Sequence, residues 1–200
     1  MAWYKTAEVE KEMEDFFKKR TNRHIDLVGK YCKEIADYDR VKFGELVERG
    51  KIHDDSKFED PEKEPYVYIS WQYKCKDEGK EFDIPQEMKD RMSRATEFHV
   101  KNPLNTHHPE ASCDKEGALI NRENRDLPPK EMIDSTKMTD LDIGEMCADW
   151  MAMSFEKGTN PKDWADKNIN IRWKFTDEQK NLIYKLLNAI WHENKEDSSN

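Results

Sequence analysis

The sequence predicts an all-α protein that folds as a single helical bundle. Apolar side chains recur at intervals of three and four residues in most segments, which is the spacing of one helix face. Charged residues make up 38% of the chain, and many are Lys and Glu, which favour helices. In no segment does the alternation of apolar and polar residues predict a strand as strongly as these intervals predict helices.

The length of 200 residues fits one domain with a buried core. Nine Met, six Trp and seven Tyr supply large side chains for that core despite the high charge. We expect an N-terminal helical extension over 1–20, a metal-binding core over 21–157, a C-terminal helical packing segment over 158–195 and a disordered tail over 196–200.

The first quarter of the chain predicts a series of helices. A first helix covers 6–20, and Thr21 with Asn22 is expected to cap a second one that ends near residue 37 and places His24 at the head of an apolar face. A short helix follows over 40–48. Residues 53–56 then open another helix, which Pro61 ends.

The rest of the chain predicts four further helices and a long loop. We expect a helix between Pro65 and Gly79, and one after Pro85 that carries His99 on the same face as Met88, Met92 and Ala95. Residues 104–129 show no sustained period and predict a long ordered loop. Two more helices are expected, one capped at Thr139 or Asp140 and ending at Phe155, the other starting at Thr176.

Composition excludes several classes of function. The formal net charge of −9 argues against binding of duplex nucleic acid. The chain has no apolar stretch long enough for a membrane span and no signal-peptide pattern at its N-terminus, so we expect a cytosolic protein. Four isolated cysteines form no C-x-x-C pair and are expected to be buried thiols, not bridges: Cys32, Cys75, Cys113 and Cys147.

The histidines carry the functional signal. Five of the six fall at expected helix faces or ends, and one of these directly precedes an aspartate: His24, His53 with Asp54, His99, His107 and His108. Imidazole and carboxylate groups are the usual ligands of Fe, Mn and Zn, and helical proteins collect them from several helices. An adjacent His-Asp pair allows both side chains to approach one ion, or the aspartate to bridge two.

These residues resemble the HD-domain superfamily of metal-dependent phosphohydrolases, whose pattern is a His, an adjacent His-Asp and a distant Asp. The matching positions are His24, His53, Asp54 and Asp149. Lys57 completes an H-D-x-x-K pattern found in the branch that hydrolyses cyclic dinucleotides. His99, His107 and His108 are similar to the additional metal ligands of that branch, although the Gly-Tyr-Pro signature is replaced here by Ala-Ser-Cys-Asp at 111–114.

The combined pattern H-I-x-x-V, H-D-x-S-K-F, H-x-x-x-N, H-H-P-E and E-M-x-x-D-W also resembles an uncharacterised family of small bacterial and phage proteins. The superfamily resemblance implies one or two divalent transition-metal ions, Fe or Mn in preference to Zn, and hydrolysis of a nucleotide or other small phosphate ester. Two alternatives remain open. One is a di-iron oxygenase of the same superfamily, and the other is a non-enzymatic interaction protein of bacterial or phage origin.

Several side chains have two interpretations. Lys57 either binds a substrate phosphate or is a surface lysine, and Glu110 either acts as a base or supports His107. Glu145 lies one helical turn before Asp149, where it either orients a ligand or is solvated. Arg122 and Arg125 in the long loop are either an anion clamp or ordinary exposed cations.

Overall fold

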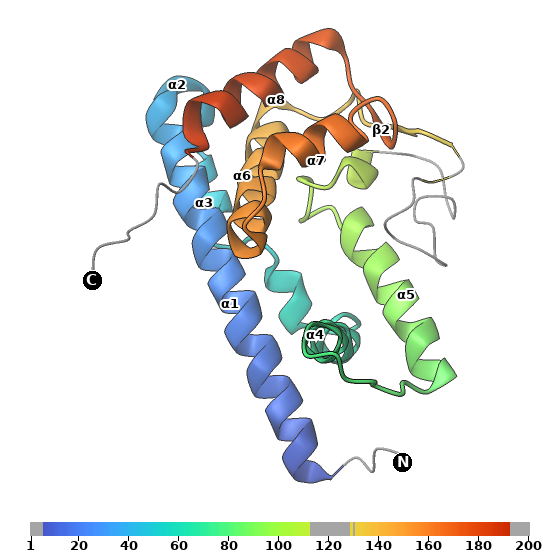
Figure 1. Ribbon diagram of the computed structural model, residues 1–200. Coiled ribbons are helices and arrows are strands. Elements are labelled where there is room, and N and C mark those ends of the chain that lie inside the picture. Colours follow the sequence, from blue (N-terminus) through green and yellow to red (C-terminus); the bar gives the residue numbers. More distant parts are fainter. Residues whose placement is uncertain (1–5, 113–128, 130, 193–200) are drawn as a thin grey trace, which may run out of the picture.

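A computed structural model describes residues 6–112, 129 and 131–192 (Figure 1). The elements are α1 (Ala7–Tyr38), α2 (Arg40–Phe43), α3 (Leu46–Arg49), the 3₁₀-helix η1 (Asp55–Phe58), α4 (Lys63–Asp77), α5 (Gln86–Lys101), the 3₁₀-helix η2 (Pro109–Ser112), β1 (Ile133–Asp134), α6 (Asp140–Lys157), α7 (Pro161–Asn168), β2 (Trp173–Lys174) and α8 (Asp177–Ile190). The fold is therefore essentially all-α, as the sequence predicts.

The first helix is longer than predicted. α1 runs without interruption from Ala7 to Tyr38, so the expected cap at Thr21 and Asn22 is wrong. Thr21 is buried because it continues the stripe of Met13, Phe17 and His24 along one face of the helix. Packing along this stripe outweighs the capping preference of a threonine, which is worth only about 1 kcal/mol.

The segment after α1 contains shorter helices than expected. The helix predicted over 40–48 is two short turns, α2 and α3, and the helix expected from 53–56 is the single 3₁₀ turn η1. Asp54 precedes η1 in the left-handed conformation, with φ at 60°. This conformation interrupts the helix at its start, and Asp tolerates it better than most residues because its short polar side chain bonds locally.

The helices on either side of residue 80 are confirmed. α4 covers Lys63–Asp77 and α5 covers Gln86–Lys101. α4 packs against both α1 and α5. Met88, Ala95 and His99 lie on the buried face of α5, as their spacing predicts.

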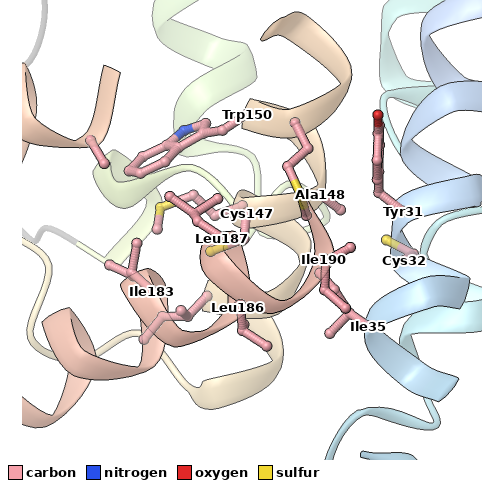
Figure 2. Packing of buried hydrophobic residues seen from close by; sticks show 14 of the residues in the cluster. Tyr31, Cys32, Ile35, Cys147, Ala148, Trp150, Ile183, Leu186, Leu187 and Ile190 are labelled. Carbon is pink, nitrogen blue, oxygen red and sulfur yellow. The ribbon is translucent and has the colours of Figure 1, made fainter. Parts of the chain in front are cut away.

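α6 is the central helix of the larger core. Thr139 caps it with a reciprocal bond to Asp142, and Gly158 ends it with a positive φ of 63°, which favours glycine. It packs against α1 on one side and α8 on the other. Figure 2 shows the core between these three helices, where α6 contributes Cys147, Ala148 and Trp150.

The C-terminal part contains elements that we did not predict. α7 begins with an Asn160 cap followed by Pro161, and β1 pairs in parallel with β2 through two residues in each strand. The helix α8 starts after Thr176, as expected. The long loop predicted over 104–129 contains η2 in its described part.

Cys32, Cys75 and Cys147 are buried free thiols, as predicted, and Cys113 lies outside the described residues. Among the described residues, no helix has both the length and the apolar character that a membrane span requires. α1 passes through residue 20 without a break, and residues of α8 belong to the same core as residues of α1 and α6. The division of the chain at residues 20, 157 and 195 stays a prediction.

Candidate metal centre

Seven predicted ligands converge on one region between the helices. α1 supplies His24, the turn before η1 supplies His53 and Asp54, α5 supplies His99, the turn before η2 supplies His107 and His108, and α6 supplies Asp149. Their ligand atoms fall into two groups, and the atoms within each group lie no more than 4.8 Å apart. Residues up to 125 positions apart in the sequence therefore form one site.

The first group consists of His24, His53 and Asp149. The Nε2 atom of His24 lies 3.0 Å from Oδ1 of Asp149 and 3.9 Å from Oδ2 of Asp54. The Nε2 atom of His53 lies 3.7 Å from the same Asp54 oxygen. Asp54 thus faces the first group with its Oδ2 atom.

The second group consists of Asp54, His99, His107 and His108. The other oxygen of Asp54, Oδ1, lies 3.1 Å from Nε2 of His99 and 4.0 Å from Nε2 of His107. The His108 ring lies against the rings of His99 and His107, with centroids 4.9 and 4.2 Å apart. Asp54 is therefore placed between the two groups, with one oxygen toward each.

Many polar atoms at this position have no hydrogen-bond partner among the described residues. Nε2 of His53, His107 and His108 are all buried and unpartnered. Burial of a polar atom without a partner costs about 1–3 kcal/mol, so three such atoms in one place require a different explanation from ordinary core packing. A metal ion satisfies such atoms, because the lone pairs of imidazole and carboxylate are its ligands.

The spacing also fits a metal ion. A first-row transition metal lies about 2.1 Å from its nitrogen and oxygen ligands, so two ligands of one ion are at most about 4.2 Å apart. The distances of 3.0, 3.1, 3.7, 3.9 and 4.0 Å given above are all within this limit. The residues therefore fit a centre of one or two ions.

Carboxylates support the opposite ring nitrogens of four histidines. Nδ1 of His24 lies 3.4 Å from Glu156, Nδ1 of His99 lies 2.7 Å from Glu62, and Glu145 lies 2.9 Å from His53 and 3.3 Å from His107. Metal-binding histidines usually bond a carboxylate through the nitrogen that does not bind the ion, which orients the ring. Glu145 is thus buried and bonded, not solvated.

Nearby charges shift the pKa values of the site. Burial opposes protonation of His24, but hydrogen bonds to Asp149 and Glu156 outweigh burial and raise its pKa to about 9. Burial likewise favours the neutral form of Asp149, yet its bond to His24 lowers its pKa to about 2. Burial and the neighbouring His107 and His99 lower the pKa of His108 well below its usual range. The carboxylates are thus held ionised and His108 neutral, as metal ligands are, whereas His24 is protonated near pH 7 and must lose its proton to bind an ion.

Lys57 and Glu110 have different positions relative to the groups. The Lys57 ammonium bonds Oδ2 of Asp54, and 19% of the side chain is exposed, so it lies between the site and solvent. Glu110 accepts a hydrogen bond of 3.0 Å from the Trp173 indole and belongs to neither group of ligands. This bond connects the turn after His108 to β2. Arg122 and Arg125 lie outside the described residues.

A family model matches residues 13–190, under the description "Family of unknown function (DUF5662)". The chain belongs to the DUF5662 family. The match covers every candidate ligand of this DUF5662 member and the three carboxylates that support them. No curated protein and no solved structure matches the chain.

Sequence reasoning missed two residues of this DUF5662 site, Glu62 and Glu156. Glu156 had a detectable signal, because it follows Asp149 by seven residues and Glu145 by eleven, and these spacings place three acids on one face of an apolar helix. Glu62 had no such signal, since it precedes α4 in a segment rich in charged residues. Its side chain is nevertheless fully buried.

Proposed function

We propose that the protein is a metal-dependent phosphohydrolase of the HD-domain type that acts on a nucleotide or another small phosphate ester. The observation that carries this proposal is the gathering of four histidines around the buried carboxylate of Asp54, where the Nε2 atoms of His53, His107 and His108 have no hydrogen-bond partner among the described residues. The order of the ligands along the chain supports it, since it follows the superfamily pattern of a His, a His-Asp pair and a distant Asp.

The ligand assignment follows the two groups. His24, His53, Asp54 and Asp149 would hold a first ion, and His99, His107 and His108 would hold a second one with Asp54 as the bridge. Imidazole and carboxylate ligands suit Fe, Mn and Zn, and the resemblance to the HD-domain superfamily favours Fe or Mn over Zn. Bound divalent ions supply a water of lowered pKa and polarise a phosphoryl oxygen.

Lys57 is the residue of this chain that we assign to the phosphate. Its ammonium has three N–H donors, of which Asp54 uses one. The remaining donors are available to a phosphate oxygen next to Asp54, where they would orient the ester and stabilise charge that develops during transfer. The cation–π contact of 5.1 Å with Tyr66 restricts the position of the ammonium.

The exposed fractions of the side chains indicate where a substrate enters. Asp149 is 18% exposed and His24 is 11% exposed, whereas His53 and His107 are 0% and 1% exposed. A substrate therefore approaches the first group from the side of His24 and Asp149, while His53 of the same group is fully buried. Because the net charge is −9, an anionic substrate is attracted only by the ions and Lys57 at short range.

The test is an anaerobic assay of phosphate release from a panel of nucleotides and an aryl phosphate, with Mn²⁺ or Fe²⁺ added and with chelator as the control. The proposal expects phosphate release that requires metal and persists without dioxygen. Turnover only with dioxygen and a reduced di-iron centre would contradict it and favour the oxygenase. Absence of both bound metal and turnover would favour the interaction protein.

A further inference from the structure

Glu145 contacts one histidine from each ligand group. Its Oε1 atom lies 2.9 Å from Nδ1 of His53 and 3.3 Å from Nδ1 of His107. His53 belongs to the group with His24 and Asp149, and His107 belongs to the group with His99 and His108. The side chain of Glu145 is 4% exposed, so this arrangement is shielded from water.

Arg49 fixes the other oxygen of Glu145. Its Nε atom donates a hydrogen bond of 2.6 Å to Oε2, so the two carboxylate oxygens serve different partners. The guanidinium is itself held by Oδ1 of Asp142 at 2.9 Å and by Oγ1 of Thr106 at 2.6 Å. Glu145 therefore has little freedom to rotate away from the two imidazole rings.

This contact determines which ring nitrogen carries hydrogen. An ionised carboxylate only accepts hydrogen bonds, so an imidazole nitrogen that bonds to it must be an N–H donor. Nδ1 of His53 makes this hydrogen bond at 2.9 Å and then carries hydrogen, and the approach of the same carboxylate oxygen to Nδ1 of His107 at 3.3 Å favours an N–H there as well. In a neutral ring this leaves the lone pair on Nε2, which is the atom that faces Asp54 in both residues.

The same three residues form a third possible set of ligands, in which an ion would lie between Glu145 and the two Nδ1 atoms. The ring nitrogens argue against this alternative, because an ion there would leave the Nε2 atoms of His53 and His107 buried without a partner. A metal ion at Nε2, with both Nδ1 atoms directed at Glu145, gives each end of each ring an interaction.

We infer that Glu145, held by Arg49, is a positioning residue that fixes the metal-binding tautomer of one histidine in each of the two groups. The inference rests on the proposed metal centre but not on the proposed reaction. It makes Glu145 necessary for both ions although it binds neither. Loss of Glu145 therefore affects the two groups together.

The direct test is long-range ¹H–¹⁵N NMR of histidine-labelled protein, which distinguishes the Nδ1–H from the Nε2–H tautomer. It is recorded on metal-free protein and on protein with Zn²⁺, which is diamagnetic, and His53→Gln and His107→Gln assign the signals. The expected result is Nδ1–H at both residues in each sample. An Nε2–H tautomer at either residue, or a metal-shifted Nδ1 signal, would overturn the inference.

Glu145→Gln provides the second test. In this variant the charged Arg49 should keep its hydrogen bond to the amide oxygen, because bonds from charged donors are stronger. The amide NH₂ group then faces both imidazoles. Since NH₂ is a donor, each Nδ1 atom must accept, and the ring hydrogen moves to Nε2. We expect the affinity for Mn²⁺ to fall about 10–100-fold in both groups. Loss of one ion only, or unchanged affinity, would overturn the inference.

Asp142→Asn is the matched control. Asp142 also lies on α6, but its carboxylate accepts hydrogen bonds from Arg49, Thr106 and Thr139, and none from a histidine. The control should lower the melting temperature and keep the histidine tautomers and the Mn²⁺ affinity. A loss of Mn²⁺ affinity in Asp142→Asn equal to that in Glu145→Gln would reduce Glu145 to a structural role.

If no metal binds to the wild type, the proposed function fails, while the tautomers of the metal-free protein still decide the role of Glu145.

Discussion

Removal of the His108 imidazole tests whether the centre holds two ions. His108 belongs to the second group only, and its Nε2 atom has no hydrogen-bond partner among the described residues. His108→Ala therefore removes a candidate ligand without leaving a carboxylate unpaired. In contrast, His99→Ala would remove the hydrogen bond between His99 and the buried carboxylate of Glu62. We expect the ion content to fall from two per chain to one, because His24, His53 and Asp149 remain.

The expected change in stability follows from linkage. An ion present at 100 times its Kd stabilises the folded state by about 2.7 kcal/mol. For a protein of this size 1 kcal/mol shifts the melting temperature by about 2–4 °C, so one ion contributes about 5–11 °C. The quantity to compare is the difference in melting temperature with and without metal, since packing losses from the substitution cancel in it.

The assay is elemental analysis of protein equilibrated with Mn²⁺, combined with thermal melts with and without chelator. His24→Ala should also leave one ion per chain, and the matched control His192→Ala should leave two, because His192 lies in an exposed position after α8. A wild type with one ion whose content does not change in His108→Ala would refute the two-ion arrangement.

Three further predictions address the surroundings of the site. Because hydrogen bonds to Asp149 and Glu156 raise the pKa of His24 to about 9, this imidazole is mostly protonated near pH 7. Metal binding should therefore release a proton from it and strengthen as the pH rises toward 9. Calorimetry in buffers of different ionisation enthalpy measures the release, and binding without it would contradict the prediction. Trp173→Phe removes a hydrogen bond to the buried carboxylate of Glu110. It should lower the free energy of unfolding by about 2 kcal/mol and the melting temperature by about 6 °C. An unchanged melting temperature would show that this bond does not hold the His107–His108 turn in place. Lys57→Gln should keep the ion content and lower kcat/KM for an aryl phosphate about 10²-fold, with Lys57→Arg retaining more activity; equal activity in all three would remove Lys57 from the reaction.

The sequence allowed prediction of the long amphipathic helices, because their burial pattern is local. α4, α5, α6 and α8 all appear where apolar spacing and capping residues place them. The helix break predicted at Thr21 is wrong, because the buried face of α1 continues through this residue. That face is buried by helices that lie far away in the sequence. β1 and β2 were missed for the same reason, since two-residue strands exist only through their mutual pairing.

The candidate site was predictable in its ligand types but not in its support. Adjacent His-Asp and His-His pairs stand out in one sequence, and the structure brings all seven predicted ligands together. The role of Glu62 depends on its contact with a histidine 37 residues away, and that of Arg49 on a contact with Glu145. Such contacts follow from tertiary packing. The left-handed backbone conformation of Asp54, which helps to orient the side chains of His53 and Asp54, also has no marker in the sequence.

The metal content per chain shows whether the protein holds a metal centre at all. The protein is purified without chelators and without a histidine tag, and the wild type is compared with His53→Ala and Asp54→Ala by elemental analysis. We expect bound transition metal in the wild type, with Fe or Mn exceeding Zn. His53→Ala should lower the content, and Asp54→Ala should lower it further because Asp54 faces both groups. A wild type that lacks stoichiometric metal, or variants that retain the same content as the wild type, would contradict the presence of a metal centre.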